Sequence, residues 1–163
     1  MNKRIRRFTY VTMLTALAIV INMMETLYIP PIQFGIRFGL ANIIALITIR
    51  LFGIREMVIV NVMRVILSSL FRGTIFGTSF WIALGGITLS SITLIITKAL
   101  NSSLKFASII SAIAHSVGQV LVVTYLYKNV NMFSYLPVLL FGSIVTGYLT
   151  GWLAELSLKR IKL

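Results

Sequence analysis

Six apolar stretches follow one another along the chain, with short polar or basic breaks between them. They run over Phe8–Leu27, Gly35–Phe52, Met57–Phe71, Ile75–Thr97, Phe106–Tyr127 and Met132–Leu158. A helix needs about 20 apolar residues to cross a bilayer, and each stretch comes near that length. The pattern predicts an all-α protein: a bundle of six transmembrane helices that forms a single integral membrane domain over residues 1–163.

The composition supports this class and removes several kinds of chemistry. The 163 residues are 58% hydrophobic, which is typical of polytopic membrane proteins. The chain has no cysteine and no aspartate, and its three acidic residues are Glu25, Glu56 and Glu155. Disulfides, thiolate metal sites and cysteine nucleophiles are therefore excluded. We predict that the protein is not an enzyme, has no cofactor and has no metal site.

The net charge of +12 is explained by membrane topology rather than by nucleic-acid binding. Lys3, Arg4, Arg6 and Arg7 precede the first stretch, which is longer than the apolar core of a signal peptide and lacks a small-residue cleavage site. If this end is cytoplasmic, so are seven more basic residues, at Arg50, Arg55, Lys98, Lys105, Lys159, Arg160 and Lys162. We therefore expect a multi-pass protein of the cell membrane with both termini in the cytoplasm.

The break after the first stretch contains Pro30 and Pro31, which disfavour helix. It predicts an ordered loop over the outer face. A lid and a simple turn both fit this composition.

Two of the apolar stretches carry a polar stripe on one helical face. Helical spacing places Asn61, Arg64, Ser68 and Arg72 on one side of the third stretch, and Ser108, Ser111, His115 and Gln119 on one side of the fifth. Serine, asparagine, glutamine and histidine commonly bond helix to helix in bundles, so these stripes also fit simple packing. Arg64 is different, because its guanidinium has five donors and a charge at bilayer depth costs about 2.5–3.5 kcal/mol.

The outer half of the bundle holds few acceptors for these donors. Glu25 is the only acidic residue away from the cytoplasmic side, and it cannot neutralise Arg37, Arg64 and Arg72 together. An excess of positive donors suits an anionic or carbonyl-rich ligand. Asn22 and Asn42 lie at compatible depths. Trp81 fits either a pocket wall or an anchor at the membrane interface.

Small residues mark two further faces. Ser143, Gly147, Thr150 and Ala154 group on one side of the last stretch, where close helix packing explains them. Thr12, Thr15, Ala16 and Ala18 form a small-residue surface on the first stretch that suits a partner helix.

Three separated strings, RFGLAN at 37–42, RVILSSLFRGT at 64–74 and HSVGQ at 115–119, resemble the Gx transporter family, which is also labelled heptaprenyl diphosphate synthase component I. The family is similar in size and helix count to the S components of energy-coupling-factor transporters. The resemblance implies a six-helix bundle that binds a ligand from the outer side and works with an energising ATPase and a transmembrane coupling subunit. It also implies that the small residues of the first stretch dock the coupling subunit.

The leading hypothesis is an S-component-like protein, surrounded by membrane lipid, that captures an anionic or amphipathic ligand. The family context suggests an isoprenoid, quinone or flavin-related ligand. The candidate ligand-binding residues are Arg37, Asn42, Asn61, Arg64, Ser68, Arg72, Trp81, His115 and Gln119. Two alternatives stay open: a membrane subunit of a quinone-linked electron-transfer system, and an accessory subunit of a prenyl diphosphate synthase. A catalytic synthase does not fit, because it needs aspartates to hold Mg²⁺.

Overall fold

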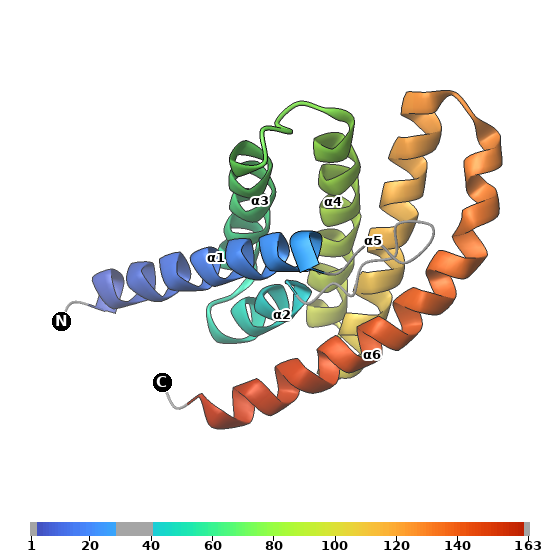
Figure 1. Ribbon diagram of the computed structural model, residues 1–163. Coiled ribbons are helices and arrows are strands. Elements are labelled where there is room, and N and C mark those ends of the chain that lie inside the picture. Colours follow the sequence, from blue (N-terminus) through green and yellow to red (C-terminus); the bar gives the residue numbers. More distant parts are fainter. Residues whose placement is uncertain (1–2, 29–40, 162–163) are drawn as a thin grey trace.

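The computed structural model describes residues 3–28 and 41–161, which are all helix and short connections (Figure 1). The segment 29–40, with Pro30, Pro31 and Arg37, lies outside the described residues. The helices are α1 (Lys3–Tyr28), α2 (Asn42–Leu51), α3 (Ile54–Phe71), α4 (Thr78–Ala99), α5 (Leu104–Tyr127), the 3₁₀ helix η1 (Val130–Tyr135) and α6 (Leu136–Arg160). The predicted all-α class with six α-helices is confirmed.

Four helical regions are long and apolar enough to cross a membrane, namely Arg4–Glu25, Thr78–Ala99, Leu104–Tyr127 and Val130–Arg160. Among the described residues, four of the six predicted spans are therefore found. Helix α2 has 10 residues, which give a length of only about 15 Å. Helix α3 is longer, but the charged residues Arg55, Glu56 and Arg64 interrupt its apolar sequence.

Helix ends follow local chemistry more than hydropathy. Helix α4 begins at Thr78 and not at Ile75, because Gly73 and Phe76 have φ angles of +66° and +59° and form a turn. Ser103 caps α5 by accepting a hydrogen bond from the amide of Phe106. Pro137 stands in the first turn of α6, where its missing amide hydrogen is not needed.

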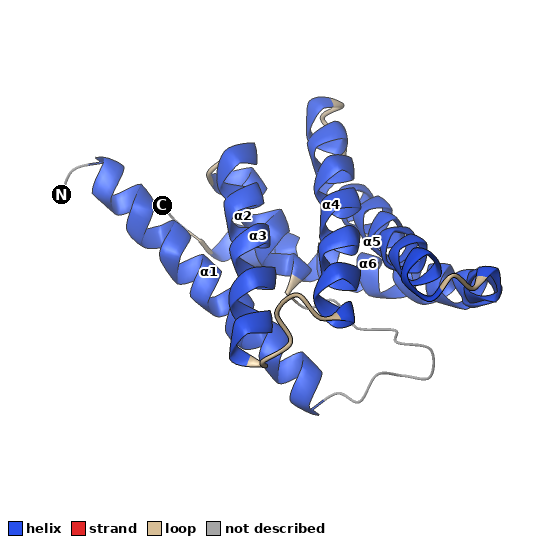
Figure 2. Cartoon of the chain, turned by 90° about the horizontal axis from the view of Figure 1, so that it is seen from above, coloured by secondary structure: helices blue, strands red, loops and turns tan. Residues whose placement is uncertain are grey.

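The six helices form two packed groups (Figures 1 and 2). Helices α4, α5 and α6 make the most extensive contacts, while α1 packs mainly on α3, and α2 lies between α3 and α6. In α4 and α5, Gly85 and Gly118 bring the two backbones together, since a Cβ on Gly118 would lie 2.5 Å from the carbonyl oxygen of Gly85. Such close approach is typical of helix packing in membranes.

One end of the bundle, called the solid end below, is filled by a buried apolar cluster. This solid core includes Leu46, Met57, Leu94 and Ala154 and joins five helices. The start of α1 and the end of α6 lie toward the same side of the molecule in both views (Figures 1 and 2). The polar cavity described below lies at the other end of this core.

Polar contacts gather around the solid end. Arg7 pairs with Glu56 at 2.7 Å and also donates to the carbonyl oxygen of Phe52. Lys98 donates to the carbonyl oxygen of Ile49 at 2.9 Å, in the last turn of α2. A cation at a helix C-terminus stabilises the unpaired carbonyl groups there.

Candidate functional site

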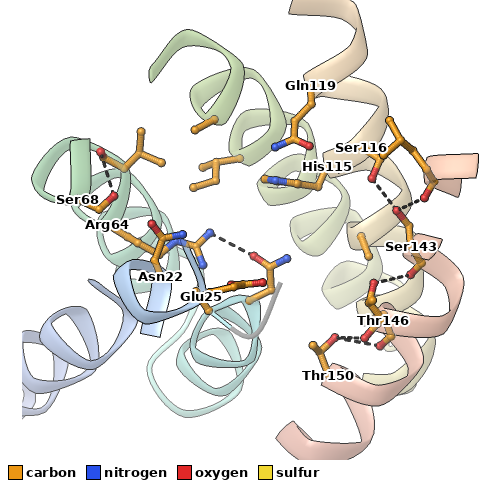
Figure 3. A pocket seen from close by; sticks show the side chains of 18 of the residues that line it. Asn22, Glu25, Arg64, Ser68, His115, Ser116, Gln119, Ser143, Thr146 and Thr150 are labelled. Carbon is orange, nitrogen blue, oxygen red and sulfur yellow. Dashed lines mark hydrogen bonds between the residues drawn. The ribbon is translucent and has the colours of Figure 1, made fainter. Parts of the chain in front are cut away.

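A polar cavity separates the two helix groups at the end opposite the solid core (Figure 3). The cavity has a volume of about 70 Å³. Its polar lining residues are Asn22, Glu25, Asn42, Arg64, Ser68, Arg72, His115, Ser116, Gln119, Ser143, Thr146 and Thr150. All six α-helices or their ends contribute to the wall.

Arg64 is the buried cation of this cavity. Its residue surface is only 4% exposed, and Nη2 donates a hydrogen bond of 3.2 Å to Oδ1 of Asn42. Its Nε is buried and has no hydrogen-bond partner among residues 3–28 and 41–161. Leaving a buried donor unsatisfied costs about 1–3 kcal/mol, and more for a charged group. The arginine is therefore held in place but keeps donor capacity for a further acceptor.

Glu25 supplies the negative charge near Arg64. It lies near the end of α1, is 5% exposed, and interacts electrostatically with Arg64. The other two acidic residues pair elsewhere: Glu56 with Arg7, and Glu155 with Lys105 and Lys159. Arg72 also lines the cavity, where its Nε donates to the carbonyl oxygen of Ser68 at 3.0 Å. The two arginines outnumber Glu25, so the described wall has a positive bias.

His115 and Gln119 form the facing wall. They stand one turn apart on α5, and Figure 3 shows both side chains directed into the cavity from the side opposite Arg64. Both belong to the stripe predicted from the sequence. An imidazole and an amide each offer donor and acceptor groups, so this wall suits oriented hydrogen bonds rather than charge.

The third wall is a seam of hydroxyl groups between α5 and α6. Ser116 and Ser143 are 2.6 Å apart between their Oγ atoms, and Ser108 Oγ lies 3.0 Å from Thr150 Oγ1. Ser143 and Thr150 also donate to backbone carbonyls one turn earlier in α6. These hydroxyls are already hydrogen-bonded, so the seam mainly holds the two helices together.

Six of the predicted ligand-binding residues come together at this cavity: Asn42, Arg64, Ser68, Arg72, His115 and Gln119. Arg37 lies outside the described residues. Three residues of the predicted α3 stripe therefore line one wall of the cavity, and two residues of the predicted α5 stripe line the facing wall.

Two predicted residues do not line the cavity. Asn61 lies one turn deeper in α3, where its Nδ2 donates to Ser91 Oγ at 3.0 Å and so joins α3 to α4. Trp81 faces a separate apolar groove on the outside of α4 and α5 and contacts Phe80 edge to face. The reason is helical rotation: Ala83 and Ile87 line the cavity, and Trp81 is turned by about 200° from Ala83.

The small-residue surface predicted on α1 is divided by the fold. Thr12 and Ala16 are exposed and Thr15 is half-buried. Ala18 is fully buried and packs with Ile44 and Val60. Ala18 therefore belongs to the internal core, and only the other positions are open to a partner.

Sequence reasoning missed the wall that α6 provides. Ser143, Thr146 and Thr150 line the cavity; Ser143 and Thr150 were attributed to helix packing alone, and Thr146 was not singled out. The spacing is as regular as that of the α3 stripe and is the signal that was present. Ser116 follows His115 directly and therefore lies off the predicted stripe of α5. In the structure it bonds across to Ser143 of α6.

The family of the chain is shown by a family model. The model for heptaprenyl diphosphate synthase component I matches residues 14–157. The chain belongs to this family. Searches of curated proteins and of solved structures each found no match. The helices and the family together describe a membrane helical protein of the heptaprenyl diphosphate synthase component I family.

Proposed function

We propose that this family member is an S-component-like membrane subunit that captures a small anionic or amphipathic ligand in the polar cavity. One observation carries the proposal: Arg64 is 4% exposed, faces the cavity, and has a buried Nε without a hydrogen-bond partner in the described part of the chain. Buried polar atoms in native proteins nearly always have partners, and an unsatisfied one calls for an explanation. We propose that an anionic ligand, once it enters the cavity and turns the guanidinium, supplies the acceptor.

The walls assign different roles to the bound group. Arg64 and Arg72 attract and hold a phosphate or carboxylate, and Glu25 limits the positive excess. Asn42, which already accepts from Arg64, fixes the guanidinium, while the facing His115 and Gln119 orient the ligand by hydrogen bonds. A space of about 70 Å³ suits a polar head group, so we propose that the apolar part of a longer isoprenoid, quinone or flavin-like ligand stays outside it.

Transport would need other subunits. The sequence contains no Gly-x-x-x-x-Gly-Lys-Ser/Thr loop, so we propose that an ATPase and a coupling subunit supply the energy. On α1, Thr12 and Ala16 are exposed and small enough to receive a partner helix. We expect the protein to copurify with an ATPase and a coupling subunit, and this result would support the arrangement.

A second candidate is an accessory, non-catalytic subunit of a prenyl diphosphate synthase. The observation that favours it is the description of the family model itself. In this role the arginines would hold the diphosphate of a substrate or product at the membrane, while a partner rich in aspartate would carry the Mg²⁺. Copurification of the protein with a soluble prenyl synthase, and not with an ATPase, would support this alternative.

A thermal-shift screen tests ligand capture directly. Prenyl phosphates, flavins, quinones and carboxylates are compared with organic cations of matched size on the purified protein. A ligand that binds only the folded state stabilises it by about 2.7 kcal/mol at 100 times its dissociation constant. We expect an anion to raise the melting temperature and the cations not to do so. Stabilisation by cations alone would contradict the proposal.

A further inference from the structure

We infer that Gly86 of α4 is a positioning residue that sets where His115 and Gln119 stand in the cavity wall and thereby limits ligand size; this inference rests on the proposed ligand capture. Gly86 is buried, and its Cα faces the two side chains of α5. A Cβ at this position would lie 2.7 Å from Cε1 and 2.9 Å from Nδ1 of His115, and 2.9 Å from Cγ of Gln119. Both side chains therefore occupy space that any other residue would fill.

Gly118, in the same helix crossing, serves a different purpose. A Cβ on Gly118 would meet backbone, with the carbonyl oxygen of Gly85 at 2.5 Å, its carbonyl carbon at 2.9 Å and the Cα of Gly86 at 3.1 Å. Backbone atoms of packed helices cannot move aside without separating the helices. At Gly86, by contrast, the three nearest atoms all belong to side chains that end in the cavity. Gly118 keeps α4 and α5 together, whereas Gly86 keeps the wall of the cavity in its place.

The size of the cavity makes this placement matter. His115 and Gln119 face Arg64 across a space of about 70 Å³ (Figure 3). A methyl group at position 86 would have to displace the imidazole and the Gln119 side chain, and both line the cavity. We expect the displaced side chains to take up part of the cavity, without loss of a charged or hydrogen-bonding group. Larger anions should suffer more than smaller ones.

The lone histidine of the chain allows a test that does not depend on the ligand. Protein labelled with ¹³C and ¹⁵N in histidine gives one imidazole signal, which is assigned to His115 without ambiguity. Gly86→Ala should shift its Cε1 and Nδ1 resonances. Thr88→Ala is the control, because Thr88 lies two residues away in the same helix but is exposed and outside the cavity lining. Unchanged imidazole resonances in Gly86→Ala would overturn the inference.

Binding of inorganic phosphate and inorganic diphosphate, measured by calorimetry, tests the effect on ligand size. We expect Gly86→Ala to weaken diphosphate binding by about tenfold or more, the effect of one surplus methylene in a fitted pocket, and phosphate binding by less. Parent-like affinities for both anions, despite a shifted imidazole, would overturn the role of Gly86 in selection. If neither anion binds the parent, the anion-capture proposal loses its support, while the imidazole resonances still decide the positioning role.

If Gly86→Ala does not fold, a variant that also shortens the side chains facing position 86 still tests the inference. His115→Ala and Gln119→Ala together remove all three atoms that the new Cβ would meet. The triple variant Gly86→Ala/His115→Ala/Gln119→Ala should therefore recover the melting temperature of His115→Ala/Gln119→Ala. A triple variant that still fails to fold would overturn the inference, because the crowding would then involve the scaffold and not the wall.

Discussion

The cavity face of α3 and the seam between α5 and α6 are both buried and polar, but their hydrogen bonds are organised differently. In the seam, hydroxyls pair across the helices, as Ser116 does with Ser143 at 2.6 Å. On α3, Arg64 contacts Asn42 at 3.2 Å yet keeps a buried Nε without a partner in the described residues. The polar groups of the seam hold α5 and α6 together, whereas the α3 face keeps one buried donor that we propose serves a ligand.

This difference separates two consequences of mutation. Loss of a seam hydroxyl that does not line the cavity, such as that of Ser108, should lower the stability of the protein and leave ligand affinity near the parent value. Loss of the Arg64 guanidinium should lower ligand affinity most. A buried polar residue is thus informative about function through its missing partners rather than through its burial alone.

The largest expected effect is an all-or-none difference in cysteine labelling. It tests which side of the membrane the cavity faces. The chain has no cysteine, so single cysteines can be introduced and labelled without background. Cysteine in place of Asn131, in the exposed η1 between α5 and α6, should react with an impermeant maleimide in intact cells, because the distribution of basic residues predicts that this turn lies outside. Leu100→Cys, in the α4–α5 connection, should react only after permeabilisation. The reverse pattern would invert the orientation and place the cavity on the cytoplasmic side.

The next effect is the loss of ligand affinity at Arg64. Arg64→Gln should weaken binding of the stabilising anion by about 2–5 kcal/mol, the range for truncating one partner of a buried charge pair. Because Glu25 then loses the favourable interaction with Arg64, the double variant Arg64→Gln/Glu25→Gln should regain stability without regaining affinity. Calorimetric titration and thermal melts measure the two quantities separately. Parent-like affinity in Arg64→Gln would remove the contrast between the α3 face and the seam.

A smaller effect is expected in the seam. Ser108 bonds to Thr150 and does not itself line the cavity. Ser108→Ala should lower the free energy of unfolding by about 0.6 kcal/mol, the average for such bonds between membrane helices. Reversible unfolding in mixed micelles measures the loss. Anion affinity that fell as much as in Arg64→Gln would show that the seam belongs to the binding site.

The smallest effect is expected at the solid end of the bundle. Arg7 and Glu56 are 2.7 Å apart, but the Arg7 side chain is 54% exposed. Exposed ion pairs contribute about 0–1 kcal/mol and weaken as salt is added. Glu56→Gln should therefore change the melting temperature slightly at low salt and less at high salt. A change as large as that of Ser108→Ala at every salt concentration would show that solvent does not screen this pair.

The sequence by itself determined the class of the protein and half of its site. Hydropathy predicted six helices, and helical periodicity placed Arg64 with Ser68 and His115 with Gln119, because side chains three and four residues apart share a face whatever surrounds the helix. Net charge and the lack of aspartate limited the chemistry in the same direct way. The strings that carry the family resemblance are also local, and the family model confirmed that family.

Only the tertiary structure decided which faces meet. Asn61 lies on the same face as Arg64, but it bonds to Ser91 of α4 instead of lining the cavity. Ser143 and Thr146 of α6 have the spacing of a packing face, yet they line the cavity beside His115. Periodicity fixes the direction of a side chain relative to its own helix axis and carries no information about the neighbouring axis. That neighbour depends on close backbone contacts such as that of Gly118 with Gly85, which form between residues 33 positions apart only when the chain is folded.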